Sequence, residues 1–351
     1  MKIHLISAVW GDQYTDLFLN VCLPNQLTPG NLRAFGETDA VYKIYTSSKD
    51  AETILDNRFY KEVESLMPTQ VVALDHLFRS SGHSTPISIL LMTQCHKAAI
   101  DSANMAKAIL VFLPPDQVYS EGAFARLIEI ASSGKRAVTL SGVRLSKETF
   151  VPAFKEKFTD ENGHMPSPSR DLVELALGHM HPITASMYID AKSPNGAPTH
   201  LYWKVGAEGF VARCLHLHPL LLNPVSKSRL IYGNFDTDYF QKAAPLPSDY
   251  YIVTDSDDIT AFEMSPVDKS VGFIGASKFN IIGYARFLKR NGHHIHKYFL
   301  TEAIRIHSTQ TDDNWEAIDA ESSNIIQAAL ALAKLPDSIL RLWAFLLEKM
   351  R

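Results

Sequence analysis

The sequence is poor in cysteine, with only three among 351 residues: Cys22, Cys95 and Cys214. They are widely spaced and form no CxxC pair. An odd, scattered set argues against a disulfide framework and against a thiolate zinc site, and it suits a reducing compartment. We therefore expect a cytoplasmic protein.

Long apolar runs are also lacking. No stretch reaches the roughly 18 apolar residues of a membrane-spanning helix, and the opening MKIHLISAVWG predicts a first strand rather than a signal peptide. The closing segment SILRLWAFLLEKMR is apolar with basic residues near its end. It predicts a packing helix or a contact in a homo-oligomer, and peripheral contact with the inner membrane face is the alternative.

An excess of positive charge is missing as well. The net charge is -4, so the chain lacks the basic character of a nucleic-acid-binding protein. Because 46% of the residues are hydrophobic, the chain can bury a large core.

Three common motifs are absent. The first strand is followed by AVWGDQY and not by GxGxxG, and neither GxxxxGK[ST] nor GxSxG occurs. These absences weigh against a Rossmann dehydrogenase, a P-loop NTPase and an α/β-hydrolase.

What the sequence does contain is a regular alternation in its first 150 residues. Short apolar runs alternate with segments of helical periodicity, and they predict strands at 3–9, 41–47, 71–75, 108–114 and 136–143. Such an alternation predicts an α/β fold with a mixed, mainly parallel sheet flanked by helices. Ligands of such sheets lie at the carboxyl ends of the strands.

The pattern changes in the rest of the chain. Residues 151–265 contain loops rich in Pro, Gly, Ser and Asn, an antiparallel portion around LYWKVGAEGFVARCLHLHPLLLNP, and one more strand at 250–254. The tail is mainly helical. We divide the chain into 1–150, 151–265 and a helical C-terminal extension at 266–351, with the first two as halves of one domain.

The first candidate for chemistry is Asp116, in FLPPDQVYSEG. An apolar strand delivers this carboxylate at its carboxyl end, where it can hold a divalent ion that offsets the charge of a diphosphate. The alternative is that Asp116 caps a turn whose geometry Pro115 fixes.

The second candidate combines HLHP with GNFDTDYF. His216 and His218 are two residues apart, so on a strand they share a face, and Asp236 and Asp238 have the same spacing. Together they can supply metal ligands and a general base. The alternative is a pair of core histidines beside a solvated loop.

The third candidate is TDSDDI, where Asp255 and Asp257 form a literal Asp-x-Asp after a strand. Such a cluster can hold Mg²⁺ or Mn²⁺, but a solvated turn or a helix N-cap is the favoured interpretation. The histidines of GHHIHKY are interpreted as surface or core residues of the helical tail.

The order of elements resembles the GT-A fold of bacterial nucleotide-sugar glycosyltransferases. SAVWGDQYTDLFLNVCLPNQLTPGN is similar to the opening of such proteins, YKIYTSSKDAE to their second strand, and ILVFLPPDQVYSEGAFARL to their metal-site strand. HLHPLLLNP, DTDY and VTDSDD resemble their second half. The resemblance covers most of residues 1–265.

The resemblance implies a place for the donor nucleotide. In this fold the base and ribose lie near the ends of the first two strands. The corresponding positions in this sequence are Ala8, Val9, Trp10 and Thr46.

It also implies a metal site and a base. Asp116 corresponds to the last Asp of the family's Asp-x-Asp motif, a late histidine commonly completes the metal site, and a carboxylate deprotonates the acceptor in inverting members. The matching residues are Asp116 with His216 or His218 for Mn²⁺ or Mg²⁺, and Asp236 or Asp238 for the base.

The implied activity is a Leloir-type, hexosyl-type transfer from a nucleoside-diphosphate sugar to a glycan, lipid-linked or protein acceptor. The sequence departs from the family at Pro114, which replaces the first Asp of the motif. A catalytically silent protein that binds a nucleotide sugar or glycan is therefore the alternative, and a metal-dependent hydrolase is a third.

Overall fold

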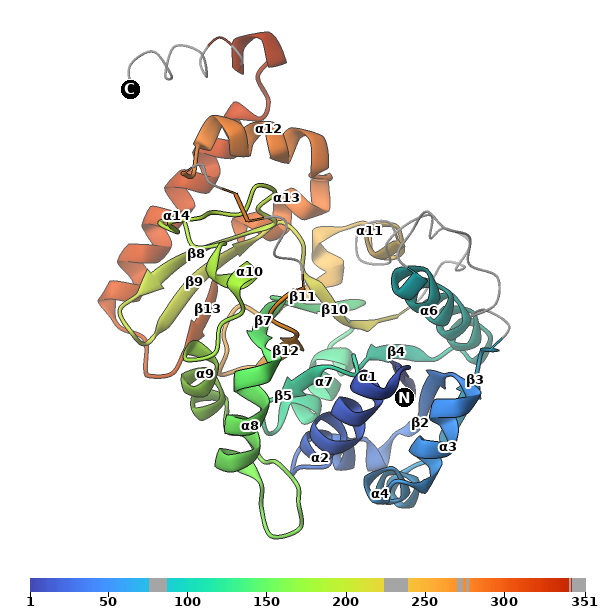
Figure 1. Cartoon of the computed structure of the whole chain (residues 1–351). Helices are drawn as coiled ribbons and strands as arrows, with labels where there is room; N and C mark the ends of the chain where they lie inside the picture. Colours follow the sequence, from blue (N-terminus) through green and yellow to red (C-terminus); the bar gives the residue numbers. More distant parts are fainter. Residues whose placement is uncertain (76–86, 224–238, 270–273, 276–277, 341, 343–351) are drawn as a thin grey trace.

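The computed structural model describes residues 1–75, 87–223, 239–269, 274–275, 278–340 and 342. Its centre is a seven-stranded sheet in the order β11-β6-β10-β4-β1-β2-β3 (Figure 1). The strands are β1 (Lys2–Ala8), β2 (Asp39–Thr46), β3 (Thr69–Ala73), β4 (Ile109–Phe112), β6 (Ala137–Leu140), β10 (His218–Leu222) and β11 (Tyr250–Ile252). All pair in parallel except β10, which runs antiparallel to both β4 and β6.

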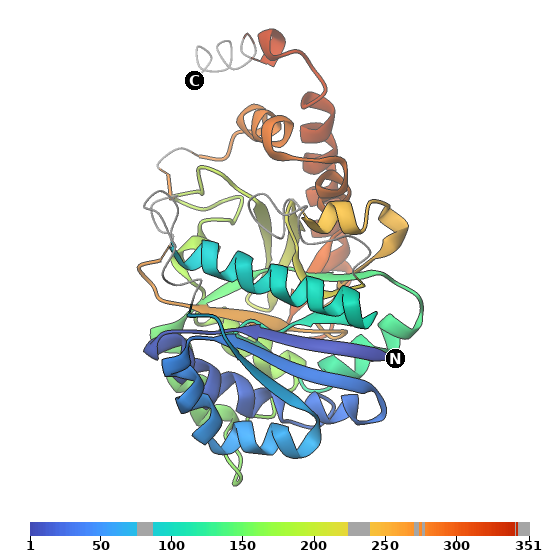
Figure 2. The ribbon, with the colours of Figure 1, turned by 90° about the vertical axis from the view of Figure 1, so that its right-hand side faces the viewer.

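Helices cover both faces of this sheet. The N-terminal helices are α1 (Asp12–Leu17), a π-helical turn η1 (Phe18–Cys22), α2 (Leu23–Gln26), the 3-10 helix η2 (Leu32–Glu37), α3 (Ser48–Asp56), α4 (Arg58–Leu66), α6 (Ile87–Ala106) and α7 (Ala123–Ser132). Helix α6 crosses one face, whereas α1 to α4 lie on the other (Figure 2). The central strand β1 is therefore covered on both sides, and Ile3, Leu5 and Ile6 are buried.

Two three-stranded sheets adjoin the main one. The first, in the order β5-β12-β7, consists of β5 (Gln117–Tyr119), β12 (Ala261–Ser265) and β7 (Val143–Ser146). The second, in the order β13-β9-β8, consists of β13 (Ile304–His307), β9 (Gly209–Cys214) and β8 (His200–Val205). The remaining helices are α8 (Lys147–Phe158), α9 (Ser169–Leu177), α10 (Pro182–Ala185), α11 (Phe240–Ala243), the 3-10 helix η5 (Pro247–Asp249), α12 (Ile281–Asn291), α13 (His294–Thr301) and α14 (Asp313–Leu332).

The helices α12 to α14 pack on the β13-β9-β8 sheet (Figure 1). A buried arginine links the two layers: Arg213 of β9 is 2% exposed and donates to the backbone oxygens of Thr301 and Asp319, the Asp319 carboxylate and the Ser322 hydroxyl. A buried guanidinium needs such partners because an unpaired charge is costly away from water.

The predicted fold class is confirmed: the sheet is mixed and mainly parallel, helices flank it, and the C-terminal part is mainly helical. The predicted division into 1–150, 151–265 and 266–351 stays a prediction. Among the described residues no helix combines the length and the apolar character needed to cross a membrane.

Several details differ from the prediction. The segment of helical periodicity between the strands expected at 41–47 and 71–75 forms two helices. It breaks at Asn57, whose side chain accepts from the backbone N–H groups of Phe59 and Tyr60 and starts α4. The strand expected at 136–143 divides at Ser141 and Gly142 into β6 and β7, which belong to different sheets. Helix α8 was not predicted.

The antiparallel portion also differs from the prediction. Only β10 joins the parallel sheet, whereas β8 and β9 form a sheet of their own with β13. Strand β13 lies in the tail that was expected to be mainly helical. It pairs with β9, which is distant from it in the sequence.

The segment LPNQLTPGN, residues 23–31, holds β5 in place through buried hydrogen bonds and close packing. Asn25 is fully buried and donates through Nδ2 to Tyr119 O at 3.0 Å, Met165 O at 3.1 Å and Ser167 Oγ at 3.0 Å, while Tyr119 N donates to its Oδ1 at 2.7 Å. Gly30, with φ +73°, lies so close to Gly122 that an added Cβ would approach its Cα to 2.7 Å. This segment therefore fixes β5, the strand that follows Asp116.

A buried polar network ties the ends of β1, β2 and β4 together. Ser7 Oγ lies 2.6 Å from Leu113 O and 2.8 Å from the Tyr42 hydroxyl, which lies 2.9 Å from the Gln26 side-chain amide. Each hydroxyl has one proton. All three hydrogen bonds form together only if Gln26 donates through its NH₂ group, Tyr42 donates to Ser7 and Ser7 donates to the carbonyl.

We predict that Asn25→Ala destabilises the fold by about 3 kcal/mol, because the backbone groups at Tyr119 and Met165 lose their buried partner. The matched control is Asn20→Ala, at an exposed position, which should change stability by less than about 0.5 kcal/mol. Urea unfolding measures both. Equal losses in the two variants would contradict this role of Asn25.

Candidate functional site

A cavity of about 330 Å³ lies at the carboxyl ends of β1 and β4. Its size is at the lower end of the range for ligand pockets. The lining residues that matter for chemistry are Ala8, Pro114, Asp116, Arg144, His218 and Glu263. They come from five segments that are distant in the sequence, and this edge of the sheet is where α/β proteins bind ligands.

Asp116 lies in the turn between β4 and β5. Met264 N donates to the Asp116 carbonyl at 2.7 Å, so the backbone of β12 holds this turn. The register of β5 and β12 pairs Gln117 with Glu263, which brings a second acidic residue next to Asp116. The Cys22 thiol donates to Pro115 O at 3.1 Å and supports the turn from the helical side.

Arg144 pairs with Glu263, and its charge also acts on Asp116. Arg144 Nε lies 2.9 Å from Glu263 Oε1. Burial and the nearby charge of Glu263 raise the pKa of Asp116 well above its usual range, against the opposing effect of Arg144. The same two carboxylates, together with burial, raise the pKa of the Tyr14 hydroxyl. Among the described residues that line this cavity, negative charge therefore exceeds positive charge when both acids are ionised.

These residues fit a divalent cation. Carboxylate oxygens are the ligands that Mg²⁺ and Mn²⁺ prefer, and a cation held between Asp116 and Glu263 would relieve the repulsion that favours the protonated form of Asp116. His218 lines the same cavity, but its ring nitrogens and the two carboxylates do not all lie within 4.8 Å of one another, as they do in the group of Asp255, Asp257 and His307.

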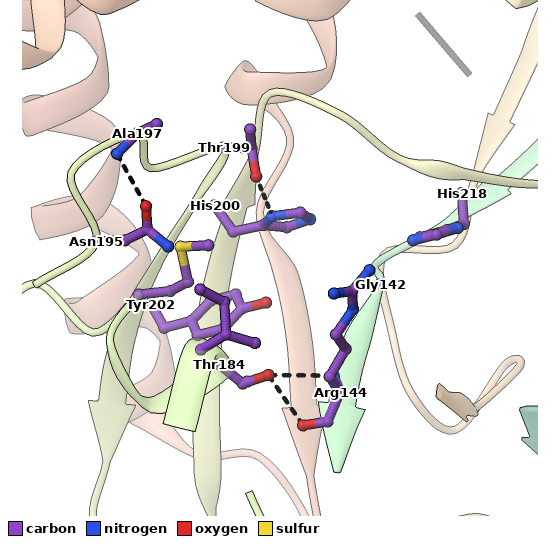
Figure 3. A pocket seen from close by; sticks show the side chains of 11 residues that line it. Gly142, Arg144, Thr184, Asn195, Ala197, Thr199, His200, Tyr202 and His218 are labelled. Atoms are coloured by element: carbon purple, nitrogen blue, oxygen red, sulfur yellow. Dashed lines mark hydrogen bonds between the residues drawn. The ribbon is translucent and has the colours of Figure 1, made fainter. Parts of the chain in front are cut away.

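The position of His218 depends on Gly142. A Cβ built on Gly142 would lie 2.2 Å from Cδ2 and 2.4 Å from Nε2 of the imidazole, far inside a van der Waals contact. His218 can therefore lie against the β6–β7 turn only because residue 142 has no side chain (Figure 3). The imidazole and the Arg144 guanidinium lie near each other at this end of the cavity.

The predicted nucleotide residues have different environments. Ala8 lines the cavity. Val9 and Thr46 are each 1% exposed, and Trp10 is partly buried against the core. The structure thus brings Ala8 to Asp116, whereas the other three do not line this cavity.

The remaining predicted residues separate in the same way. His218 faces the cavity, but His216 packs against His296 with ring centroids 4.6 Å apart. Burial, with the charges of neighbouring histidines, lowers the pKa of His216 to about 4. Asp236 and Asp238 lie outside the described residues, so their role as a base stays a prediction.

Two acidic residues were not predicted: Glu263, which lines the cavity, and Asp50, which holds the turn after β1. Glu263 is a single acid in the apolar strand AFEMS, and this isolated charge was the available signal. Asp50 is 5% exposed and accepts from Gly11 N at 3.0 Å, Thr15 Oγ1 at 3.2 Å and Ser47 Oγ at 2.5 Å. It holds the turn after β1, where Gly11 has φ +81°.

A second acidic group lies elsewhere. Asp255, Asp257 and His307 have potential ligand atoms within 4.8 Å of one another, the only such metal-binding group among the described residues. His307 Nε2 lies 2.8 Å from Asp255 Oδ1, and Arg170 pairs with Asp257 at 2.7 Å. The hydrogen bond from His307 lowers the pKa of Asp255.

The two acidic sites differ in charge balance. The carboxylates of Asp255 and Asp257 each have a basic partner, and Asp257 N donates to Asp255 Oδ1 at 2.8 Å, as in a self-contained turn. Among the described residues of the first site, Arg144 is the one cation near Asp116 and Glu263. A bound cation would therefore offset more uncompensated charge at Asp116 than at Asp255, although Asp255 lines a cavity of about 440 Å³.

Comparisons with known proteins find solved structures that are distantly similar to this chain. It matches no protein-family model. No curated protein matches it either. Among solved structures, mouse xyloside xylosyltransferase 1 is similar at 15% identity and a TM-score of 0.28, over 45% of this chain and 60% of that one. A putative glucose-1-phosphate thymidylyltransferase from Bacillus anthracis is similar at 14% identity and a TM-score of 0.25, over 46% and 62%.

A third structure, the mannosyltransferase PcManGT from Pyrobaculum calidifontis in complex with GDP-Man and Mn²⁺, is similar at 13% identity and a TM-score of 0.35, over 99% of this chain and 80% of that one. The chain spans less than two thirds of the length of the first two. Two of the three are glycosyltransferases by name, which is the class that the sequence resembles. At these identities and scores, the case for a function rests on the site residues.

We predict that Asp116→Asn stabilises the metal-free protein at alkaline pH. The folded-state pKa of Asp116 lies above its unfolded value, so its contribution to stability is present at acid pH and is lost as the pH rises through the folded pKa. Asparagine cannot ionise and avoids that loss.

The measurement is the melting temperature in EDTA between about pH 5.5 and pH 9, over which an unperturbed Asp stays ionised. The gain of Asp116→Asn over the wild type should grow with pH, whereas Asp268→Asn, at an exposed position, should show no such trend. A gain that is independent of pH would show that Asp116 is ionised throughout.

Proposed function

We propose that this chain is a glycosyltransferase that moves a sugar from a nucleoside-diphosphate donor to an acceptor, with the donor diphosphate in the Asp116 cavity. The observation that supports this most is the meeting of Asp116, Ala8 and His218 in one cavity at the carboxyl ends of β1 and β4. Asp116 and His218 were predicted from the sequence as metal ligands, and Ala8 was predicted as a nucleotide contact. The three residues are distant in the sequence. The sequence pattern that suggested each one therefore did not by itself require that they line the same cavity.

The charges suit a diphosphate that is bound with a cation. A divalent ion held by Asp116 and Glu263 would offset the negative charge that develops on a departing nucleoside diphosphate. Arg144 supplies a planar guanidinium that can donate to phosphate oxygens through two N–H groups. Its bond to Glu263 at 2.9 Å keeps it oriented toward the cavity until a phosphate competes for it.

The rest of the chain orients these groups. Asp50 fixes the backbone after Ala8, and the β5-β12 pairing fixes Asp116 relative to Glu263. A preorganised site of this kind stabilises developing charge without having to rearrange during the reaction. We further propose Asp236 or Asp238 as the base that takes the proton of the acceptor hydroxyl.

A second candidate function is binding without transfer. It is favoured by Pro114, which replaces the first Asp of the family motif, and by the existing pairing of Arg144 with Glu263, which lowers the net charge available to a metal. Slow hydrolysis of the donor in the absence of acceptor separates the two, because a transferase leaks some product to water and a pure binding protein does not.

We predict that at least one of the UDP, GDP, CDP and dTDP sugars raises the melting temperature, and that Mn²⁺ increases the shift, because a ligand that binds only the native state stabilises it. Asp116→Ala should abolish the effect of Mn²⁺. Asp255→Ala, in the other acidic group, is the matched control and should retain it.

Thermal shift at millimolar donor, a concentration that reports even weak sites, measures all three proteins. If Asp255→Ala loses the Mn²⁺ effect while Asp116→Ala keeps it, the donor site is at the second acidic group. No shift with any donor would contradict the proposed function.

A further inference from the structure

A second cavity, of about 320 Å³, adjoins the first and shares Arg144 and His218 with it. Figure 3 shows its walls. On the far side from His218 they come from α10, the loop that follows it and the start of β8. The lining side chains that carry the inference are Thr184, Asn195, Ala197, Thr199, His200 and Tyr202.

His200 presents a neutral imidazole to this cavity. Burial, together with the charges of His218, His216 and Arg144, lowers its pKa to about 3. Thr199 Oγ1 lies 2.9 Å from Nδ1, whereas Nε2 is buried without a hydrogen bond within the described structure. The backbone of His216 is near enough to favour the protonated ring but does not meet the geometry of a hydrogen bond. When Thr199 donates to Nδ1, the ring proton is on Nε2, which has almost no accessible surface, so the imidazole forms part of the cavity wall and does not donate to a ligand.

Asn195 offers a hydrogen-bond donor to the cavity. Its side chain is 8% exposed, and its Oδ1 accepts from Ala197 N at 2.8 Å, which fixes the amide plane. The Nδ2 group has no protein partner among the described residues and points into the cavity (Figure 3). A buried amide that is preoriented and half-satisfied is a hydrogen-bond donor for a ligand.

Arg144 is the only charged side chain in the described lining of this cavity, and it lies at the junction with the first. Thr184 fixes its backbone, accepting from Arg144 N at 3.2 Å and donating to Arg144 O at 2.9 Å. The remainder of the lining alternates amide, hydroxyl and imidazole groups with the apolar Ile183, Met187 and Ala197. Such a wall suits a molecule with hydroxyl groups on apolar carbons and without charge.

We infer that this second cavity binds the acceptor, and that the acceptor unit is an uncharged sugar. The role of this ligand as an acceptor rests on the proposed function. Its identification as an uncharged sugar rests on the lining of this cavity alone. A sugar hydroxyl accepts from Asn195 Nδ2, and the ring carbons lie against the apolar residues and the His200 ring. The reacting hydroxyl lies toward His218 and Arg144, where the cavity joins the donor cavity.

The test fills the cavity. Ala197 lines it and contributes only a methyl group, so Ala197→Trp should occupy the ligand space while the backbone hydrogen bond to Asn195 stays. Ala207→Trp, on the exposed turn between β8 and β9, is the matched control. Saturation-transfer NMR measures binding of maltose, cellobiose and N,N′-diacetylchitobiose, with glucose 6-phosphate and an acidic peptide as the charged probes.

We expect at least one uncharged disaccharide to give a signal with the wild type and Ala207→Trp, and none with Ala197→Trp. Asn195→Asp, which keeps Oδ1 but replaces the Nδ2 donor with an oxygen, should weaken that binding several-fold, and it is informative even if Ala197→Trp fails to fold. The inference is overturned if only the charged probes bind, if no sugar binds, or if binding survives both variants of the cavity.

Donor binding separates this result from the proposed function. UDP and GDP with Mn²⁺ should bind Ala197→Trp as they bind the wild type, because Asp116 and Glu263 are unchanged. Loss of nucleotide binding in the wild type would contradict the proposed function, whereas loss of sugar binding with nucleotide binding intact would contradict only the inference drawn here.

Discussion

The site depends on an imbalance of charge: Asp116 and Glu263 lie together at the end of β4, and Arg144 pairs with only one of them. Water is partly excluded there and no described residue pairs with the second carboxylate, so a proton or a bound cation would neutralise it. The pairing of β5 with β12 keeps the two acids in this unfavourable proximity. The fold thus pays a local cost in stability, which is the usual mark of a site that is shaped for a ligand.

The place of Asp116 could be predicted because it follows from local pattern. An apolar strand, two prolines and an acidic residue suffice to put a carboxylate at the edge of a parallel sheet. Glu263 could not be found in that way, since it reaches Asp116 through the pairing of strands that are distant in the sequence. The period-two rule also failed for His216 and His218, because β10 begins only at His218 and the alternation of faces does not extend to the residue before it. The pair separates, and only His218 reaches the cavity.

The segments that carry the family resemblance do mainly structural work. Asn25 and Gly30 clamp the segment that follows Asp116, and Gly11 belongs to a turn that Asp50 fixes. A pattern of this kind predicts the fold well, because the same packing problem recurs wherever that fold occurs. It says less about the ligand, and Val9 and Thr46 illustrate this: they occupy the expected positions at the strand ends, but their side chains are in the core.

The buried Arg213 has a consequence for how the chain is organised. Its guanidinium lies in β9, yet its acidic partner Asp319 is on α14, and β13 completes the same sheet from the C-terminal side. A protein cut after residue 265 would leave the Arg213 guanidinium without its partners on the C-terminal helices, and it would leave one edge of β9 unpaired. The helical extension is therefore part of the folding unit that builds the wall of the second cavity, and a fragment without it should be a poor substitute for the whole chain.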